Sequence, residues 1–377
     1  MYHIGFIIEQ MLGHITHGKT LQKNISQASS VHTHWAFPKP DVGGFLGHVS
    51  NWTVQAGLQS RQAIRQMQRD AKQINGAKMD ALFFHSQVTA MLAQDWMSRI
   101  PSVVSMDATP LQYDALGKFY NHEPGSRKAE RIKFLINRRC YQQARHIVTW
   151  SQWAKDGLTG EYGISAEKIT VIPPGVNPLE WKRPAPRTLE NTDAPVKVLF
   201  VGGNLDRKGG NLLLEACQRL NQSGFKIELH LVTRDTVETQ PNVFVYNNMQ
   251  PNSTELRALY HECDIFCLPT YGDCLPMVLS EAAAAGMPSI STDVAAIPEV
   301  VHDQETGFIV PTGSVEAIEA SLKQLIEQPQ RRLEMGARAQ TRLGQTFDAE
   351  RNAHRLLTLL KQVADQSEVT RKVAFTN

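Results

Sequence analysis

Residues 268–288 of the chain are LPTYGDCLPMVLSEAAAAGMP. The apolar start predicts the end of a buried strand, and the Ala-rich stretch after Pro276 predicts a helix that Gly286 ends. Pro276 suits the first helical position, N1, which would leave the amides of Met277 and Val278 as unpaired donors at the positive helix end. The stretch therefore predicts a strand, a loop and a helix whose N-terminus binds an anion.

Two carboxylates flank this predicted anion pocket. Asp273 precedes the helix, and Glu281 lies about one turn inside it. Carboxylates accept hydrogen bonds from sugar hydroxyls, so the pair fits a sugar-bearing ligand. The simpler interpretation is that Asp273 complements the helix dipole and that Glu281 lies on a solvated helix face.

A second glycine-bearing loop lies upstream, at residues 201–210 (VGGNLDRKGG). It separates a predicted strand from a predicted helix, so Arg207 and Lys208 lie at the carboxyl end of a strand, where α/β sheets bind ligands. Glycines let the backbone approach a diphosphate, and the two cations neutralise its charge. A turn whose basic residues face solvent is the alternative.

The chain of 377 residues is long enough for two domains. Short apolar runs alternate with helix-like stretches in both halves, which is typical of doubly wound sheets. The predicted strands are 4–8, 81–84, 102–105, 147–150, 169–172, 197–201, 227–232 and 264–268. The predicted helices are 56–74, 126–144, 211–220, 253–261 and 276–285. We therefore expect an α/β protein with domains at 1–172 and 196–345, a proline-rich linker at 173–195, and a C-terminal helix at 346–377 that caps the second domain or crosses back to the first.

Composition excludes several classes of protein. The chain is 42% hydrophobic and 20% charged, which argues against disorder, and 39 basic against 37 acidic residues exclude nucleic-acid coating by charge. The five scattered cysteines indicate neither a disulfide framework nor a zinc site. We expect a cytoplasmic protein, because we find no secretion signal and no run of about 18 apolar residues.

Taken together, the motifs of the second half resemble those of family 4 glycosyltransferases, over about residues 145–312. Before that range the resemblance is only topological. The stretches that carry it are Asp273-x7-Glu281 with the Ala-rich helix, Gly286, Pro288, PEVV at 298–301, TGFIV at 306–310, Lys208-Gly209, and IPPGVN at 172–177.

The resemblance implies a GT-B fold, in which two Rossmann-like domains face each other across a cleft. The C-terminal domain would bind a nucleotide diphosphate sugar, and the N-terminal domain an acceptor, whether sugar, lipid or small molecule. Such enzymes, here most simply a hexosyltransferase, retain anomeric configuration and need no metal or other cofactor. By carry-over, Lys208 would contact the diphosphate, Glu281 the ribose, Asp273 the transferred sugar, and the amides of Met277 and Val278 phosphate and sugar oxygens. The other candidate donor-binding residues are Gly13, Arg207, Cys274, Leu275 and Pro276.

Two positions depart from the family pattern. Asp273 stands where Glu is usual, so the sugar would lie closer or a different hexose would bind. Gly203 stands where Arg is usual, and the spacing suggests that Arg207 supplies the missing guanidinium.

In the first half, Asp107 follows the predicted strand at 102–105, where relatives have a His near the reacting sugar. A carboxylate there could orient the acceptor hydroxyl or stabilise a cationic sugar carbon, so Asp107 and Asp273 are the catalytic candidates. A cap of the turn before Pro110 is the structural alternative for Asp107. His85 is a weaker candidate of the same kind, and His14 and His17 are candidates for the acceptor side.

Two other hypotheses concern these histidines and residues 13–20, which include two of them. The spacings of His14, His17, His32 and His34 suggest zinc, but no carboxylate or thiolate completes a ligand set. Residues 13–20 (GHITHGKT) match the phosphate-binding P-loop pattern, although four residues separate them from the preceding strand. A P-loop ATPase or kinase using Lys19 and Thr20 is thus one alternative function, and a sugar-nucleotide binding module without turnover is another.

Two helices carry basic faces. Arg61, Arg65 and Arg69 recur every fourth residue in one of them. In the other, residues 126–144, basic residues accompany several aliphatic ones. Such faces suggest peripheral contact with anionic lipid at the inner face of a membrane. An ordinary solvated helix with an apolar core side is the alternative.

Overall fold

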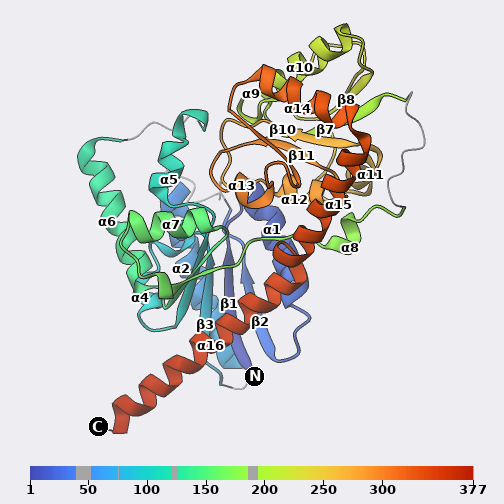
Figure 1. The fold of residues 1–377 in the computed structure, drawn as a ribbon. Coiled ribbons are helices and arrows are strands. Elements are labelled where there is room, and N and C mark those ends of the chain that lie inside the picture. The colour runs from blue at the N-terminus through green and yellow to red at the C-terminus, as the bar shows by residue number, and fades with distance from the viewer. Residues whose placement is uncertain (40–51, 75, 121–124, 186–193, 377) are drawn as a thin grey trace. The chain divides into compact units, whose positions relative to one another are not determined.

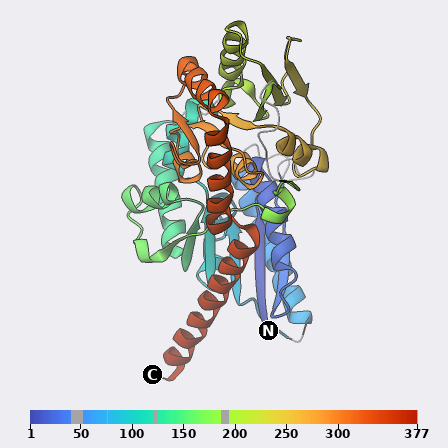
Figure 2. The same ribbon diagram turned by 45° about the vertical axis from the view of Figure 1, so that its right-hand side comes forward.

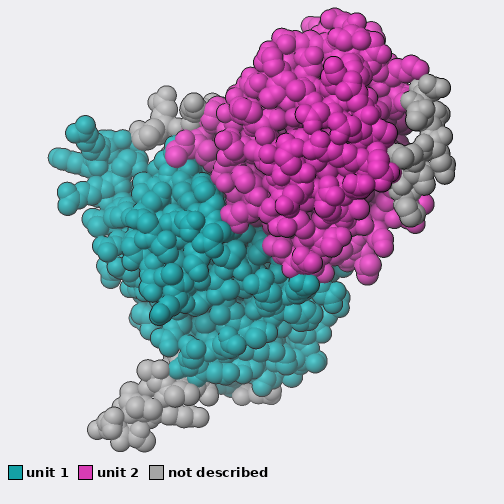
Figure 3. Space-filling model, in the orientation of Figure 1, with its two compact units in different colours: residues 1–114, 123–174, 349–377 teal, residues 115–122, 175–348 magenta. Residues whose placement is uncertain are grey.

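Two six-stranded sheets form the centre of the protein, and every strand pair within them is parallel. The computed structural model describes residues 1–39, 52–74, 76–120, 125–185 and 194–376, and only the backbone of Leu12, Lys118 and residues 367–376. The chain divides into unit 1 (residues 1–114, 123–174 and 349–377) and unit 2 (residues 115–122 and 175–348) (Figure 3).

Unit 1 has the strand order β2-β1-β3-β4-β5-β6. Its strands are β1 (Tyr2–Ile8), β2 (Val31–Ala36), β3 (Ala81–His85), β4 (Ser102–Met106), β5 (His146–Thr149) and β6 (Ile169–Val171). Its helices are α1 (Leu12–Ile25), α2 (Trp52–Gln73), α3 (Gln87–Ala90), α4 (Gln94–Met97), α5 (Pro110–Ala115), α6 (Arg127–Gln143), α7 (Gln152–Gly160) and α16 (Ala349–Thr376), with a 3₁₀ turn at Ala166–Lys168.

Helices cover both faces of this sheet (Figures 1 and 2). One apolar cluster joins the sheet to α2, α3, α4, α6 and α7. A second cluster joins the opposite face to α1 and α16, because alternate side chains of each strand point to opposite faces. The central strands β3 and β4 are buried along their whole length, as parallel strands between two helical layers require.

Unit 2 has the strand order β12-β11-β10-β7-β8-β9. Its strands are β7 (Val196–Val201), β8 (Ile227–Val232), β9 (Val243–Tyr246), β10 (Ile265–Leu268), β11 (Ser289–Thr292) and β12 (Gly307–Val310). Its helices are α8 (Pro178–Trp181), α9 (Leu205–Lys208), α10 (Gly210–Gln222), α11 (Thr254–Glu262), α12 (Met277–Ala284), α13 (Ile297–Val300), α14 (Val315–Glu327) and α15 (Pro329–Thr346), with a 3₁₀ turn at Gly117–Phe119. Helix α12 packs against β10, β11 and α15, and α10 packs against α14.

The units differ in detail from the domains expected from the sequence. The C-terminal helix α16 belongs to unit 1, where it packs along α1, whereas residues 115–122 cluster with unit 2. Part of the expected linker forms α8, whose Trp181 packs edge-on against Tyr260 in unit 2. Residues 186–193 of that linker lie outside the described residues. Within the described residues, no helix is both long and apolar enough to cross a membrane.

The P-loop hypothesis is wrong. Residues 13–20 lie inside α1, so most of their amides serve the helix and form no phosphate cradle. The glycine that completes the pattern has a packing role instead, since a Cβ on Gly18 would lie 2.4 Å from Ile8 Cγ2 on β1. Gly13 lies in the first turn of α1, where an added Cβ would meet no atom within 4 Å, so nothing in the described structure requires glycine there.

Candidate active site

The segment after β7 is held by a glycine that no other residue can replace without strain. Gly209 has φ +74°, and a Cβ there would lie 2.0 Å from the carbonyl oxygen of Pro269. Asn204 caps the short helix α9 by accepting a hydrogen bond from the amide of Arg207. This conformation places the basic residues of α9 against the loop that follows β10.

That loop, residues 269–276, is tied to α9 by several hydrogen bonds. Arg207 Nη1 donates to the carbonyl oxygen of Gly272 at 2.7 Å. The carbonyl of Arg207 accepts from the amide of Tyr271 at 2.9 Å and from Thr270 Oγ1 at 3.1 Å. The ends of β7 and β10, neighbours in the sheet, thus present one continuous surface.

Lys208 and Asp273 form an ion pair across this surface. Their side chains are only 13% and 15% exposed. Burial and, to a smaller extent, the neighbouring Arg207 guanidinium together lower the pKa of Lys208 to about 7. The carboxylate of Asp273 acts in the opposite direction, because an adjacent negative charge favours the ammonium form. The structure therefore brings together the two side chains predicted to hold diphosphate and sugar.

Helix α12 begins beside this pair, at Met277. Pro276 is its N-cap, with ψ 114°, and not its N1 residue as expected, because this extended conformation lies outside the helix. The first amides of the helix, of Met277 and Val278, have no intrahelical acceptor, and no side chain in the described part of the chain caps this end. Cys274 and Leu275 are 4% and 6% exposed, which leaves mainly their backbone groups for a ligand.

Glu281 is buried in the second turn of α12. The interpretation that Glu281 lies on a solvated helix face is therefore wrong. Tyr260 Oη donates to Glu281 Oε2 at 2.9 Å. Burial raises the pKa of Glu281 to about 7, and the hydrogen bond from Tyr260 opposes this shift. Burying an ionisable carboxyl group lowers the stability of the folded chain, so a carboxyl group at such a position is a candidate functional group.

Sequence reasoning missed the aromatic residues that contact this surface from residues 115–122. The Tyr120 ring lies 4.6 Å from the Arg207 guanidinium carbon, and Phe119 stacks on Tyr271 with ring centroids 5.5 Å apart. Gly272 permits this stacking, since a Cβ there would lie 2.9 Å from Phe119 Cβ. No local motif signals such contacts, because the partners are about 90 to 150 residues apart in the sequence.

In unit 1 the predicted acceptor-side residues gather at the carboxyl ends of β3, β4 and β5. His14 Nε2 lies 3.8 Å from Asp107 Oδ2. The rings of His14 and His17 lie 5.0 and 5.1 Å from that of His85, and both pack on Trp150. Asp107 and His14 are 27% and 15% exposed, whereas His85 is fully buried and touches no solvent.

Burial keeps the inner histidines of this cluster neutral. Burial lowers the pKa of His17 to about 3, with a contribution from His14, and lowers the pKa of His85 well below its usual value. Among the residues that the structure describes, neither ring nitrogen of His85 has a hydrogen-bond partner. Among the residues that the structure describes, no three His, Cys, Asp or Glu side chains are arranged to hold a metal ion.

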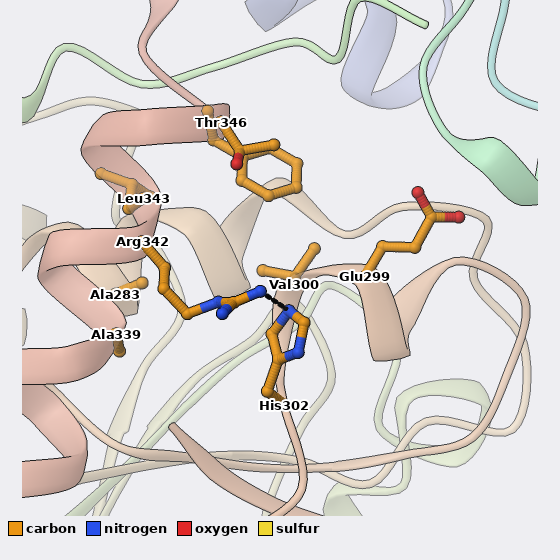
Figure 4. Close-up of a pocket in the computed structure, with 9 residues that line it drawn as sticks. Ala283, Glu299, Val300, His302, Ala339, Arg342, Leu343 and Thr346 are labelled. Atoms are coloured by element: carbon orange, nitrogen blue, oxygen red, sulfur yellow. Dashed lines mark hydrogen bonds between the residues drawn. The ribbon is translucent and has the colours of Figure 1, made fainter. Parts of the chain in front are cut away.

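A small cavity lies on the α15 side of α12 (Figure 4). Arg342 donates to His302 Nε2 at 2.8 Å, and Glu299 points away from this pair. The cavity measures about 20 Å³, which is room for roughly one water molecule and not for a nucleotide. This cavity is therefore not the candidate site, which in unit 2 is the surface where Lys208, Asp273 and the start of α12 come together.

Family models match both halves of the chain. The model described as Glycosyltransferase Family 4 matches residues 21–179, and the model described as Glycosyl transferases group 1 matches residues 195–328. The chain belongs to glycosyltransferase family 4. This family 4 chain is 28% identical over 179 residues to the amylovoran biosynthesis glycosyltransferase AmsK of Erwinia amylovora, a match covering 43% of each chain. The chain spans about half the length of the curated relatives it matches.

Solved structures confirm the expected GT-B fold. The sucrose-phosphate synthase of Thermosynechococcus elongatus superposes with a TM-score of 0.73 at 16% identity, covering 96% of this family 4 chain and 99% of the other. HepE of Anabaena in complex with UDP-glucose gives a TM-score of 0.66 at 15% identity, covering 98% and 100%. At these identities the likeness establishes the fold alone.

Proposed function

We propose that this chain transfers a hexose from a nucleotide diphosphate sugar to an acceptor hydroxyl, with retention of anomeric configuration and without a metal ion. The observation that carries the proposal is the ion pair of Lys208 and Asp273 beside the uncapped start of α12. One cation, one carboxylate and a set of free amides lie on one surface at the carboxyl ends of β7 and β10. Family membership and the UDP-glucose complex of the similar HepE structure support the donor class.

The ion pair has a direct role in donor binding. Lys208 is neutralised by Asp273 in the ligand-free chain, and a diphosphate oxygen would compete with that carboxylate for the ammonium group. Phosphate binding would then free Asp273 to accept hydrogen bonds from hydroxyls of the transferred sugar. The buried Glu281, held by Tyr260, would accept hydrogen bonds from the ribose.

The chemistry follows from where charge develops. As the glycosidic bond to the diphosphate breaks, the bonding electrons leave with phosphate oxygen and the sugar carbon gains cationic character. Lys208 and the amides of Met277 and Val278 would stabilise the leaving diphosphate without a metal ion. Asp107 in unit 1 would orient the acceptor hydroxyl or stabilise the sugar cation, and His14 would lie beside it.

Arg207 has a different role from that of a free phosphate ligand. Its guanidinium already donates to Gly272 and lies over Tyr120, so it fixes the loop that carries Asp273. Gly203 stands where the family usually has an arginine. Arg207 compensates for this missing arginine in two ways, because it holds the loop in place and supplies a positive charge.

Release of nucleoside diphosphate tests the function. The chain would be incubated with UDP-, GDP- and ADP-hexoses and a mixture of acceptors, in the presence of a chelator. We expect release from one donor, loss of release in Lys208→Met, and normal release in Lys323→Met, which removes an exposed lysine of α14 that pairs with Glu327 and lies over the Phe225 ring. A requirement for divalent metal would contradict the metal-free mechanism. Donor binding without release from any acceptor mixture would favour a binding module.

A further inference from the structure

Helix α6 exposes a row of aliphatic side chains on one face, with a basic side chain at each end of the row. Ile132, Leu135 and Ile136 are 58%, 51% and 41% exposed. With Lys128 and Arg139 they follow the spacing i, i+4, i+7, i+8, i+11, which places all five on one face of the helix. We call these five residues the α6 stripe. Globular helices ordinarily point such aliphatic side chains inward, and here the inward face is filled by other residues, of which Asn137, Cys140 and Tyr141 are buried.

The charge around the α6 stripe has one sign. Arg127 and Arg131 are exposed next to it, and among the described residues neither they nor Lys128 and Arg139 form an ion pair. The acidic residue of the helix, Glu130, lies toward the opposite side, where it contacts Lys133 and accepts from the amide of Gly125. Lys133 itself is held by Asp114. The outer face of α6 is therefore aliphatic in its middle and basic around it.

We propose that the α6 stripe binds an anionic lipid surface, with Ile132, Leu135 and Ile136 entering the headgroup region and the flanking cations contacting lipid phosphates. A helix with this composition lies in the plane of the interface, because its aliphatic side chains leave water while its long basic side chains reach outward to the headgroups. Charge complementarity selects this occupant. A second copy of the chain would bring the same cations together, which opposes self-association through this face.

Helix α2, on the same face of the unit 1 sheet, provides an internal comparison. It also exposes three cations, Arg65, Arg69 and Lys72. Its stretch from Arg61 to Lys72 exposes no large aliphatic side chain, and Arg61 is paired with Asp95. The proposal therefore predicts that α6 and not α2 contacts lipid, although both helices are basic.

Vesicle co-sedimentation of the full chain tests this. We expect binding at low salt to vesicles of phosphatidylcholine with phosphatidylglycerol, and much weaker binding to phosphatidylcholine alone. Lys128→Gln/Arg131→Gln/Arg139→Gln should lower the partition coefficient about 100-fold, since each cation near an anionic surface contributes about 1 kcal/mol. The matched variant Arg65→Gln/Arg69→Gln/Lys72→Gln removes the same charge and should lower it less than about tenfold.

The aliphatic half of the proposal has its own test. Ile132→Ser/Leu135→Ser/Ile136→Ser should also bind anionic vesicles weakly, with an unchanged melting temperature because these side chains lie outside the core. All five native cysteines are buried, so an environment-sensitive dye on Leu135→Cys should label that site selectively and shift to the blue on binding vesicles. The same dye on Arg65→Cys should not shift.

Three outcomes would overturn the proposal. These are no binding of the wild-type chain to anionic vesicles, equal losses in the two charge variants, or full binding by the serine variant with no spectral shift at position 135.

Discussion

Replacing Glu281 with glutamine should stabilise the ligand-free chain and weaken its nucleotide binding. The pKa of Glu281 is raised from 4.5 to about 7 by burial, so the folded state holds a proton that the unfolded state releases. With such a carboxyl group, the free energy of unfolding is highest below pH 4.5. It falls as the pH rises toward 7, because the unfolded state then releases a proton that the folded state retains. Glutamine is neutral at every pH and keeps an oxygen for the hydrogen bond from Tyr260.

The size of the effect follows from the shift. The difference between the two pKa values corresponds to about 3 kcal/mol, because one pKa unit is worth 1.36 kcal/mol. Relative to wild type, Glu281→Gln should therefore be more stable by about 1 kcal/mol at pH 5.5 and by about 3 kcal/mol at pH 8.5. For a unit of this size that is a gain in melting temperature of roughly 5–10 °C at pH 8.5.

Thermal unfolding of the two proteins at both pH values measures this gain. Glu327→Gln on the exposed face of α14 is the matched control and should change little at either pH. The same Glu281→Gln chain should bind nucleotide poorly, because an amide accepts ribose hydroxyls less strongly than a carboxylate does. A variant that is less stable than wild type at pH 8.5, or equally stable at both pH values, would refute the reasoning.

Three further predictions concern the candidate site in unit 2 and the P-loop pattern at residues 13–20. Gly209→Ala should destabilise the chain by about 2–4 kcal/mol, through its positive φ and a backbone clash, whereas Gly203→Ala should change stability by under about 0.5 kcal/mol. Differential scanning fluorimetry compares them. Lys19→Ala should leave nucleotide binding unchanged, because Lys19 is an exposed residue of α1; a loss in calorimetric titration would revive the P-loop. Tyr260→Phe should raise the pKa of Glu281 and shift the pH profile of nucleotide binding upward, and an unshifted profile would contradict the role of this hydrogen bond.

The local pattern of residues 268–288 predicted its own structure well. A strand, a loop and a helix follow one another as the apolar run, the polar interval and the Ala-rich stretch indicate. The detail that failed, Pro276 at N1, depends on a single backbone angle that the sequence does not encode. The predicted strand ranges omit β11 and β12 as well as β2 and β9. Of these four strands, β2 and β9 both lie at sheet edges and have no dense apolar run. Their side chains are partly exposed, so they lack the dense apolar runs of the central strands.

What the sequence could not predict are contacts between distant residues. The partner of Glu281 is Tyr260, on another helix, and the aromatic contacts of Tyr120 and Phe119 come from residues 115–122. Gly18 misled the motif search because glycines at packing contacts and in phosphate loops are identical in sequence. Only the three-dimensional structure distinguishes a helix that needs a small residue from a loop that binds phosphate.

The most direct test of the proposed donor site is the affinity of the chain for nucleoside diphosphates, measured by calorimetric titration without metal. We expect one of UDP, GDP and ADP to bind, and Lys208→Met to bind it at least about tenfold more weakly, since a hydrogen bond to a charged group is worth about 1.5–3 kcal/mol. Lys323→Met should bind like wild type. Equal affinities of wild type and Lys208→Met would contradict the account, because the diphosphate would then bind elsewhere.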